Sequence, residues 1–137
     1  MSKLPFAKIH FYQTIIVAFI SILSLGGCSK YSNEVQANLT KLKKTKACSG
    51  CDLSGIELIS FDLKNADISG ANLTGANLSR SDLTGANLTD TNLSGADLLG
   101  VNLTGATLTN TNLTGVKLSY ANISEVEMSN VMLVRAK

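Results

Sequence analysis

The residues best placed to do chemistry are two cysteines, Cys48 and Cys51, in the sequence CSGC. A C-x-x-C spacing is typical of thiol redox enzymes, but neither a strand–helix–strand pattern nor a partner histidine accompanies it. The one histidine, His10, stands among the first residues. Two cysteines also supply only half of a tetrahedral metal shell. The motif therefore favours a buried pair, as thiols or as a disulfide, over catalysis, and we expect no metal or other cofactor.

The third cysteine, Cys28, closes a different pattern. Lys3 and Lys8 precede an apolar run over 14–25, which is shorter than the roughly 20 residues that span a bilayer and suits a secretory signal. The closing LGGC resembles the lipobox of bacterial lipoproteins. That resemblance implies acylation of Cys28, cleavage before it, and acyl chains that hold the protein on a membrane. The alternative is an uncleaved amphiphilic anchor.

The resemblance to lipoproteins also implies a cellular location. Ser29 follows the lipobox cysteine, and in a bacterium with two membranes a residue other than aspartate favours the outer membrane, facing the periplasm. We therefore predict an exported, lipid-anchored protein with three segments. They are a signal peptide at 1–27, a lipidated tether with a capping helix at 28–47, and a repeat domain at 48–137.

The segment before the repeats has a helical pattern. Val35, Leu39 and Leu42 fall on one face at helical spacing. The other faces carry four lysines: Lys41, Lys43, Lys44 and Lys46. One interpretation is an amphipathic helix that covers the end of the following domain. The other is a basic patch near anionic lipid headgroups, and both can hold together.

From Cys51 the chain parses without a gap into 17 five-residue units that end at Arg135. The third position is always Leu, Ile or Met, the first is mostly small, the second is usually Asn or Asp, and the fifth is often Gly. A period of five fits neither a helix nor a flat strand, whereas a turn in every unit produces a square coil of four units. The pattern resembles the pentapeptide-repeat family, A-[DN]-L-x-x. This resemblance implies an all-β fold, a right-handed quadrilateral β-helix of about four coils.

The residue types fit such a coil. Third-position side chains stack every 20 residues, which predicts one ladder of Leu53, Leu73, Leu93, Leu113 and Leu133 and a second of Leu58, Leu78, Leu98 and Leu118. The first position also points inward, where Ala fits beside the crowded axis. Gly at the fifth position and Asn or Asp at the second suit tight corners.

Composition narrows the function. The net charge of +2 implies neither a nucleic-acid binder nor an acidic tail. Outward positions carry mainly Ser, Thr, Asn and Gly, without a base to activate a nucleophile, so we expect no enzyme. Some pentapeptide-repeat proteins mimic DNA and bind topoisomerases. From Cys48 onward this chain has nine acidic and five basic residues, which is a weakly acidic balance for a DNA mimic. Export would also place the chain away from DNA. A membrane-anchored structural or protein-interaction module is the favoured function. DNA mimicry and a thiol-redox role are the alternatives.

Two surfaces are candidates for an unidentified protein partner. The register places four outward residues on one side of the prism: Ile59, Arg80, Leu99 and Tyr120. At the carboxyl end, Met132 and Val134 point outward beside inward Val131 and Leu133, where polar residues are expected. Because members of the resembled family pair through their carboxyl-terminal coils, this end implies a possible homodimer. A monomer whose last residues fold back is the alternative.

Overall fold

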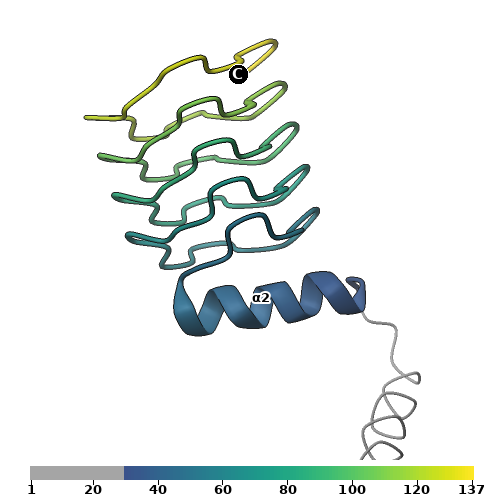
Figure 1. Cartoon of the computed structure of the whole chain (residues 1–137). Helices are drawn as coiled ribbons and strands as arrows, with labels where there is room; N and C mark the ends of the chain where they lie inside the picture. Colours follow the sequence, from purple (N-terminus) through teal and green to yellow (C-terminus); the bar gives the residue numbers. More distant parts are fainter. Residues whose placement is uncertain (1–29) are drawn as a thin grey trace, which may run out of the picture. The chain divides into compact units, whose positions relative to one another are not determined.

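The structure is a computed structural model that describes residues 30–137. The predicted signal peptide and Cys28 lie outside the described residues. In chain order, the described part has one helix, α2 (Asn33–Thr45), followed by stacked coils that continue to the carboxyl terminus (Figure 1). Tyr31–Lys137 form one structural unit.

Local hydrogen bonds explain where α2 begins and ends. The Ser32 side chain accepts a hydrogen bond from the Val35 N–H at 3.2 Å, which satisfies one of the free donors of the first turn. At the other end Lys46 adopts a left-handed conformation with φ 52°, and its N–H donates to the Leu42 carbonyl at 2.8 Å. Glu34 in the first turn and the lysines of the last turn complement the helix dipole.

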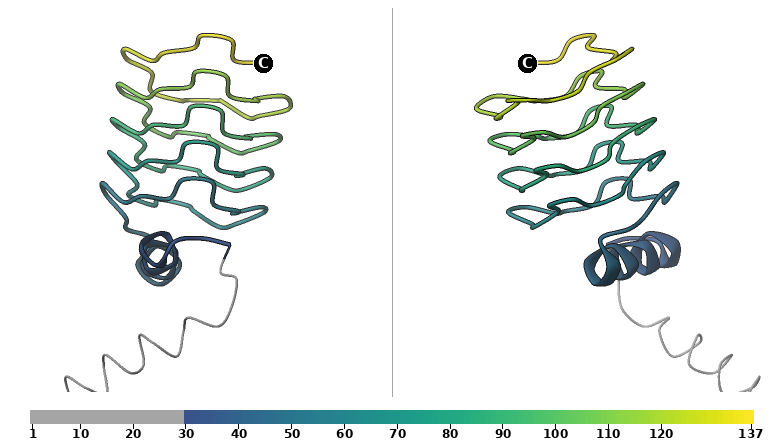
Figure 2. Two further views of the ribbon diagram at one scale, coloured as in Figure 1. Left: turned by 90° about the vertical axis from the view of Figure 1, so that its right-hand side faces the viewer. Right: turned by 60° about the vertical axis from the view of Figure 1, so that its left-hand side comes forward.

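One face of α2 packs on the first coil, residues 46–65. Val35, Leu39 and Leu42 are buried in the same hydrophobic cluster as the coil interior. The Asn38 side chain donates to the Asp52 carbonyl oxygen at 3.0 Å. Figure 2 shows from two further sides that α2 lies across the amino-terminal end of the stack. The helix therefore covers apolar side chains that the first coil leaves open.

The coils are held together by parallel pairing of residues 20 apart. This pairing consists of isolated bridges, one per unit, from Ala47–Asp67 to Asn112–Met132. Between neighbouring coils, the Leu53 N–H donates to the Asn72 carbonyl at 2.8 Å and the Asn72 N–H to the Cys51 carbonyl at 2.9 Å. In the described residues, each side of the prism therefore pairs with the next coil through a single bridge and forms no extended strand.

The stack begins one unit earlier than the sequence parse. Residues 46–50 already have the conformation of a repeat unit, and the Cys48 N–H donates to the Asp67 carbonyl at 2.7 Å. The parse from Cys51 missed this unit because Lys46 stands at its first position, where the other units carry apolar or small residues. Lys46 is both the residue that caps the carboxyl end of α2 and the first residue of the first coil.

Each corner combines a left-handed fifth residue with a turn closed by the second residue. Gly85 has φ +66°, which glycine adopts without strain, and a Cβ atom there would lie 2.5 Å from the Asn65 Oδ1 atom, so the Asn65 side chain would have to move. In the same unit the Thr84 N–H donates to Asp82 Oδ1 at 3.0 Å. This side-chain turn repeats in most units and explains the preference for Asn and Asp at the second position.

The interior is built from the third and first positions, as the register predicts. Leu53, Leu73, Leu93 and Leu113 are fully buried, and alanines fill the first positions of several units. The last leucine of each ladder, at the carboxyl end, is not fully buried. Leu133 is 51% exposed and Leu118 is half-buried, because no further coil covers the last one.

Candidate interaction surfaces

Cys48 and Cys51 lie at the junction between α2 and the first coil. Both side chains are buried, and their sulfur atoms are bonded at 2.08 Å, with the Cα atoms 5.3 Å apart. The Cys48 sulfur lies 3.5 Å from the Asn38 carbonyl oxygen of α2. The pair therefore faces the interior, where a protein substrate has no direct access.

Residues 30–137 provide no other centre with recognisable chemistry. They contain no group of three or more His, Cys, Asp or Glu side chains that could hold a metal ion. Their one helix, α2, is also too short and too polar to cross a membrane. The remaining candidate surfaces are the outward faces of the stack and its two ends.

The predicted side-by-side placement of Ile59, Arg80, Leu99 and Tyr120 agrees with the coil register; we call these four residues the apolar column. Arg80 N–H donates to the Leu99 carbonyl at 2.8 Å, which fixes neighbouring coils against each other. Ile59 is 51%, Leu99 37% and Tyr120 91% exposed. The Arg80 Cγ atom lies 3.8 Å from the position of a Cβ on Gly100, so its side chain extends over the next coil. Three apolar side chains and an arginine thus share one exposed face.

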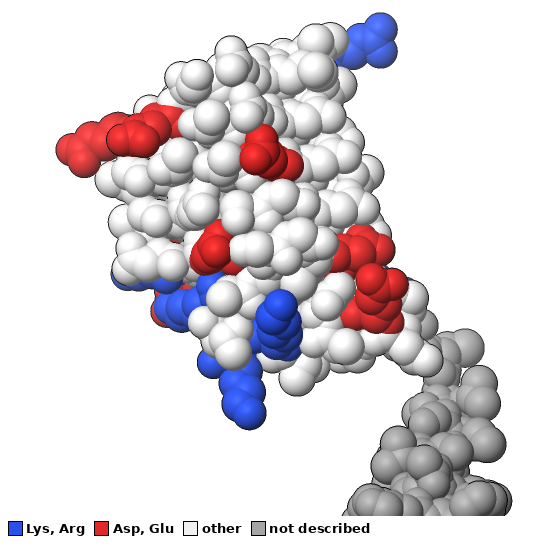
Figure 3. Space-filling view, viewed as in Figure 1, with Lys and Arg blue, Asp and Glu red and all other residues white. Residues whose placement is uncertain are grey.

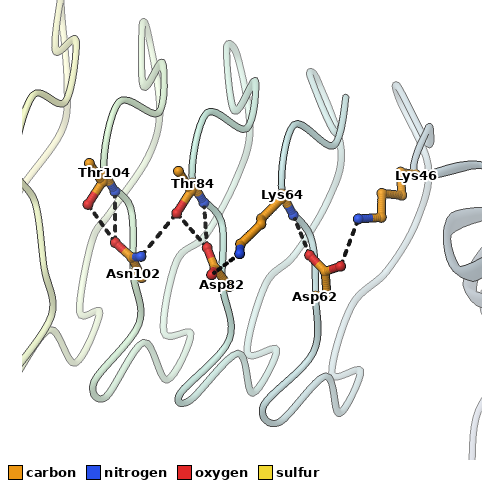
Figure 4. A network of polar contacts seen from close by, with 7 residues as sticks. All are labelled: Lys46, Asp62, Lys64, Asp82, Thr84, Asn102 and Thr104. Atoms are coloured by element: carbon orange, nitrogen blue, oxygen red, sulfur yellow. Dashed lines mark hydrogen bonds and ion pairs between the residues drawn. The ribbon is translucent and has the colours of Figure 1, made fainter.

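A second column of side chains is polar and continuous across the coils (Figure 4). Lys46 pairs with Asp62 at 2.9 Å, and Lys64 pairs with Asp82 at 3.3 Å. The Asn102 amide donates a hydrogen bond of 3.0 Å to the hydroxyl of Thr84 in the preceding coil. Exposed ion pairs of this kind contribute about 0–1 kcal/mol each. This column ties the end of α2 to successive coils, and its charges already have partners.

Hydrogen bonds lower the pKa values of the aspartates at the second position, in most cases from within their own turns. At Asp82 the hydrogen bond from the Thr84 hydroxyl lowers the pKa of the carboxyl group below its usual value, and Lys64 adds to the shift. At Asp97 the backbone N–H of Leu99 is the main cause of the lowered pKa, with Lys117 assisting at 3.1 Å. The pKa values of Asp52 and Asp67 are lowered mainly by hydrogen bonds from Ser54 and Ser69 of their own turns, whereas the pKa of Asp62 is lowered mainly by the hydrogen bond from Lys46. These carboxylates serve the fold rather than acid–base chemistry.

The carboxyl end of the stack is uncovered in this single chain. Met132 and Val134 are exposed on the outside of the last coil, and Val131 is half-buried beside them. The backbone N–H groups of Met128 and Leu133 have no acceptor among the described residues, because these groups bond to the following coil elsewhere in the stack. An apolar, unpaired coil edge is a surface that proteins ordinarily cover.

Charge is distributed unevenly over the described residues. On the face shown in Figure 3, most Lys and Arg side chains gather near the end formed by α2 and one lies at the opposite end, whereas Asp and Glu are spread over the coils. Between Asn33 and Lys46 four lysines accompany a single acid, Glu34. The α2 end is therefore rich in lysine, whereas the carboxyl end combines exposed apolar side chains with Arg135 and Lys137.

Comparison with known proteins assigns these coils to a family. The chain belongs to the family described as pentapeptide repeats, which matches it in eight copies over segments that together span 48–133, more than half of the sequence. None of the curated protein sequences matches the chain significantly.

Two solved structures show the same architecture. A pentapeptide repeat protein from the Arabidopsis thaliana thylakoid lumen is 30% identical over 82% of this chain and 72% of its own, with a TM-score of 0.65. A pentapeptide repeat protein from Nostoc PCC 7120 is 27% identical over 74% of this chain and 94% of its own, with a TM-score of 0.52. These relatives imply that the coils form a right-handed β-helix.

Proposed function

We propose that this protein is an exported, lipid-anchored pentapeptide-repeat protein that acts as a non-catalytic protein-interaction module. The observation that carries the proposal is the apolar column, in which Ile59, Leu99 and Tyr120 are exposed on a face of a solenoid whose other outward positions are mainly polar. Exposed aromatic and arginine side chains gathered on a rigid scaffold are the usual composition of binding hot spots. The partner is a protein that buries this face.

The proposed anchor is Cys28, acylated after cleavage of residues 1–27. It is supported by the positive start, the short apolar run and the closing LGGC of the sequence. The Arabidopsis relative resides in the thylakoid lumen, and this supports an exported location. In a bacterium with two membranes, Ser29 favours the outer membrane, with the repeats facing the periplasm.

In this compartment the Cys48–Cys51 pair serves as a structural disulfide. Exported proteins reach an oxidising environment in which disulfides persist. Burial beneath α2 supports a structural role over the thiol-redox alternative. The DNA-mimic alternative is disfavoured because Asp62, Asp82 and Asp97 are paired with lysines rather than aligned as free charges.

Metabolic labelling tests the anchor. Cells that produce the wild-type chain with radiolabelled palmitate should yield a labelled protein that begins at Cys28. Cys28→Ser should abolish the label and leave the precursor uncut, whereas Cys51→Ser, which leaves the lipobox intact, should still be labelled. Palmitate on the Cys28→Ser chain, or cleavage of the wild type at another site, would refute the anchor.

A further inference from the structure

The folded domain begins almost immediately after the proposed lipid anchor. The Tyr31 hydroxyl accepts a hydrogen bond from the Glu57 N–H at 3.0 Å, and its side chain packs against the hydrophobic cluster of the stack. Tyr31 is therefore tied to the first coil. Only Ser29 and Lys30 separate it from Cys28. Three Cα–Cα steps of a fully extended chain reach about 11 Å, so an acylated Cys28 holds the amino-terminal end of the stack at the membrane surface.

The surface at that end is the outer face of α2. Because Val35, Leu39 and Leu42 are buried against the first coil, the opposite face of the helix points away from the stack. Helical spacing places Ala37, Lys41 and Lys44 on this opposite side, and all three are exposed. The face thus carries Lys41 and Lys44 among small and neutral side chains, with the exposed Glu34 on its Lys41 side at the start of the helix.

These two lysines differ from their neighbours in having no partner. The Lys43 ammonium group lies over the Phe61 ring, 5.8 Å from its centre, and Lys46 pairs with Asp62. The ammonium groups of Lys41 and Lys44 make no ion pair or hydrogen bond with the other described residues. Their charges remain available to an external anionic group.

We infer that the outer face of α2 docks on an anionic lipid surface through Lys41 and Lys44, so that the solenoid stands on the membrane with its carboxyl end directed away. This inference rests on the proposed lipid anchor. The tether of about 11 Å is comparable to the Debye length of about 8 Å at physiological ionic strength. At that range each lysine near an anionic surface favours the docked state about fivefold. A helix diameter of about 10 Å and four coil spacings of about 4.8 Å place the carboxyl end roughly 30 Å from the headgroups.

Fluorescence quenching in vesicles tests this orientation. The lipidated protein, purified from membranes, carries a fluorophore on Ala37→Cys and is reconstituted into vesicles with a quencher on the lipid headgroup. One set is pure phosphatidylcholine and the other contains about one third phosphatidylglycerol. We expect stronger quenching in the anionic vesicles, and its loss in about 1 M salt, where the Debye length is about 3 Å. A fluorophore on Asn130→Cys should stay unquenched in both.

Charge reversal supplies the matched control. Lys41→Glu with Lys44→Glu should lower the ratio of docked to undocked protein by at least about 25-fold, the product of two fivefold terms. Arg135→Glu with Lys137→Glu makes the same change of charge at the exposed carboxyl end, away from α2, and should leave the quenching as it is. Equal quenching of the Ala37 probe in both vesicle types overturns the docking. If palmitate labelling fails, the anchor and the docking are both refuted, whereas labelling without lipid-dependent quenching refutes the docking alone.

Discussion

The Thr111 hydroxyl donates a hydrogen bond of 2.8 Å to the carbonyl oxygen of Leu88, which lies 23 residues earlier, and both groups are buried inside the solenoid. Thr91 makes the same bond to Ile68 at 3.0 Å. Ser81 does so with Leu58. A hydroxyl at the inward first position is therefore tolerated because the coil below supplies an acceptor, which satisfies the buried donor.

This bond predicts a measurable loss of stability. Thr111→Val keeps the shape of the side chain but removes the donor, and should lower the free energy of unfolding by about 1 kcal/mol. Thr109→Val, two residues earlier at an outward position, should change it by less than about 0.5 kcal/mol. Urea unfolding followed by circular dichroism measures both. A larger loss at Thr109 than at Thr111 would contradict the assignment of inward and outward positions.

The leucine ladder predicts a sharper contrast between adjacent residues. Leu93 is fully buried in the middle of its ladder, so Leu93→Asp places an unpaired charge in the core and should unfold the domain or make it insoluble. Asn92 accepts hydrogen bonds from the Ser94 N–H and the Asn112 amide through Oδ1. A carboxylate can accept both, so Asn92→Asp should be nearly silent in thermal unfolding. Similar melting temperatures for the two variants would show that the register is wrong.

The lowered pKa values of the second-position aspartates predict loss of stability in acid. A carboxyl group whose pKa is lower in the folded state contributes stability above its unfolded value of about 3.9, and loses it as the pH falls through the folded pKa. Stability should therefore change little through these groups between pH 7 and 5 and decline below about pH 4. Asp82→Asn, which retains acceptors for the Thr84 hydrogen bonds, should make this decline shallower. If Asp82→Asn lost stability below pH 4 as steeply as the wild type, the contribution assigned to the Asp82 carboxylate would be contradicted.

The uncovered carboxyl end predicts a homodimer. Covering Met132, Leu133 and Val134 with a second copy removes apolar surface from water and pairs the free coil edge. Light scattering on the unacylated domain should therefore report a dimer, and Met132→Asp with Val134→Asp should produce a folded monomer. A wild-type monomer at high protein concentration would support the alternative, in which the last residues fold back on their own coil.

The sequence predicts the interior of the solenoid well because a strict period of five leaves few choices. Once Leu93 faces inward, the side chains 20 residues away must do the same, and the buried positions of Leu73 and Leu113 agree. The five-residue period does not by itself reveal where the stack begins. The first unit starts with Lys46, which breaks the pattern of first positions because it also ends α2.

The features that sequence could not supply depend on contacts between coils or with the helix. The hydrogen bond from the Glu57 N–H to Tyr31 joins residues 26 apart with no repeating relation between them. The pairing of Lys46 with Asp62 depends on how α2 meets the first coil. The apolar column, by contrast, needed only the register, since Ile59, Leu99 and Tyr120 interrupt a run of otherwise polar outward residues.

The central claim, that the protein is an interaction module working through the apolar column, is tested most directly by cross-linked capture of its partner from native membranes. The lipidated wild type is compared with a triple variant, Ile59→Ser, Leu99→Ser and Tyr120→Ser, and with a matched variant of polar residues on other sides of the prism, Thr89→Ala, Ser94→Ala and Thr109→Ala. All should have the same circular dichroism spectrum. We predict that the wild type and the matched variant recover the same partner protein and that the triple variant loses it. Recovery of that partner by the triple variant at the wild-type level would contradict the account.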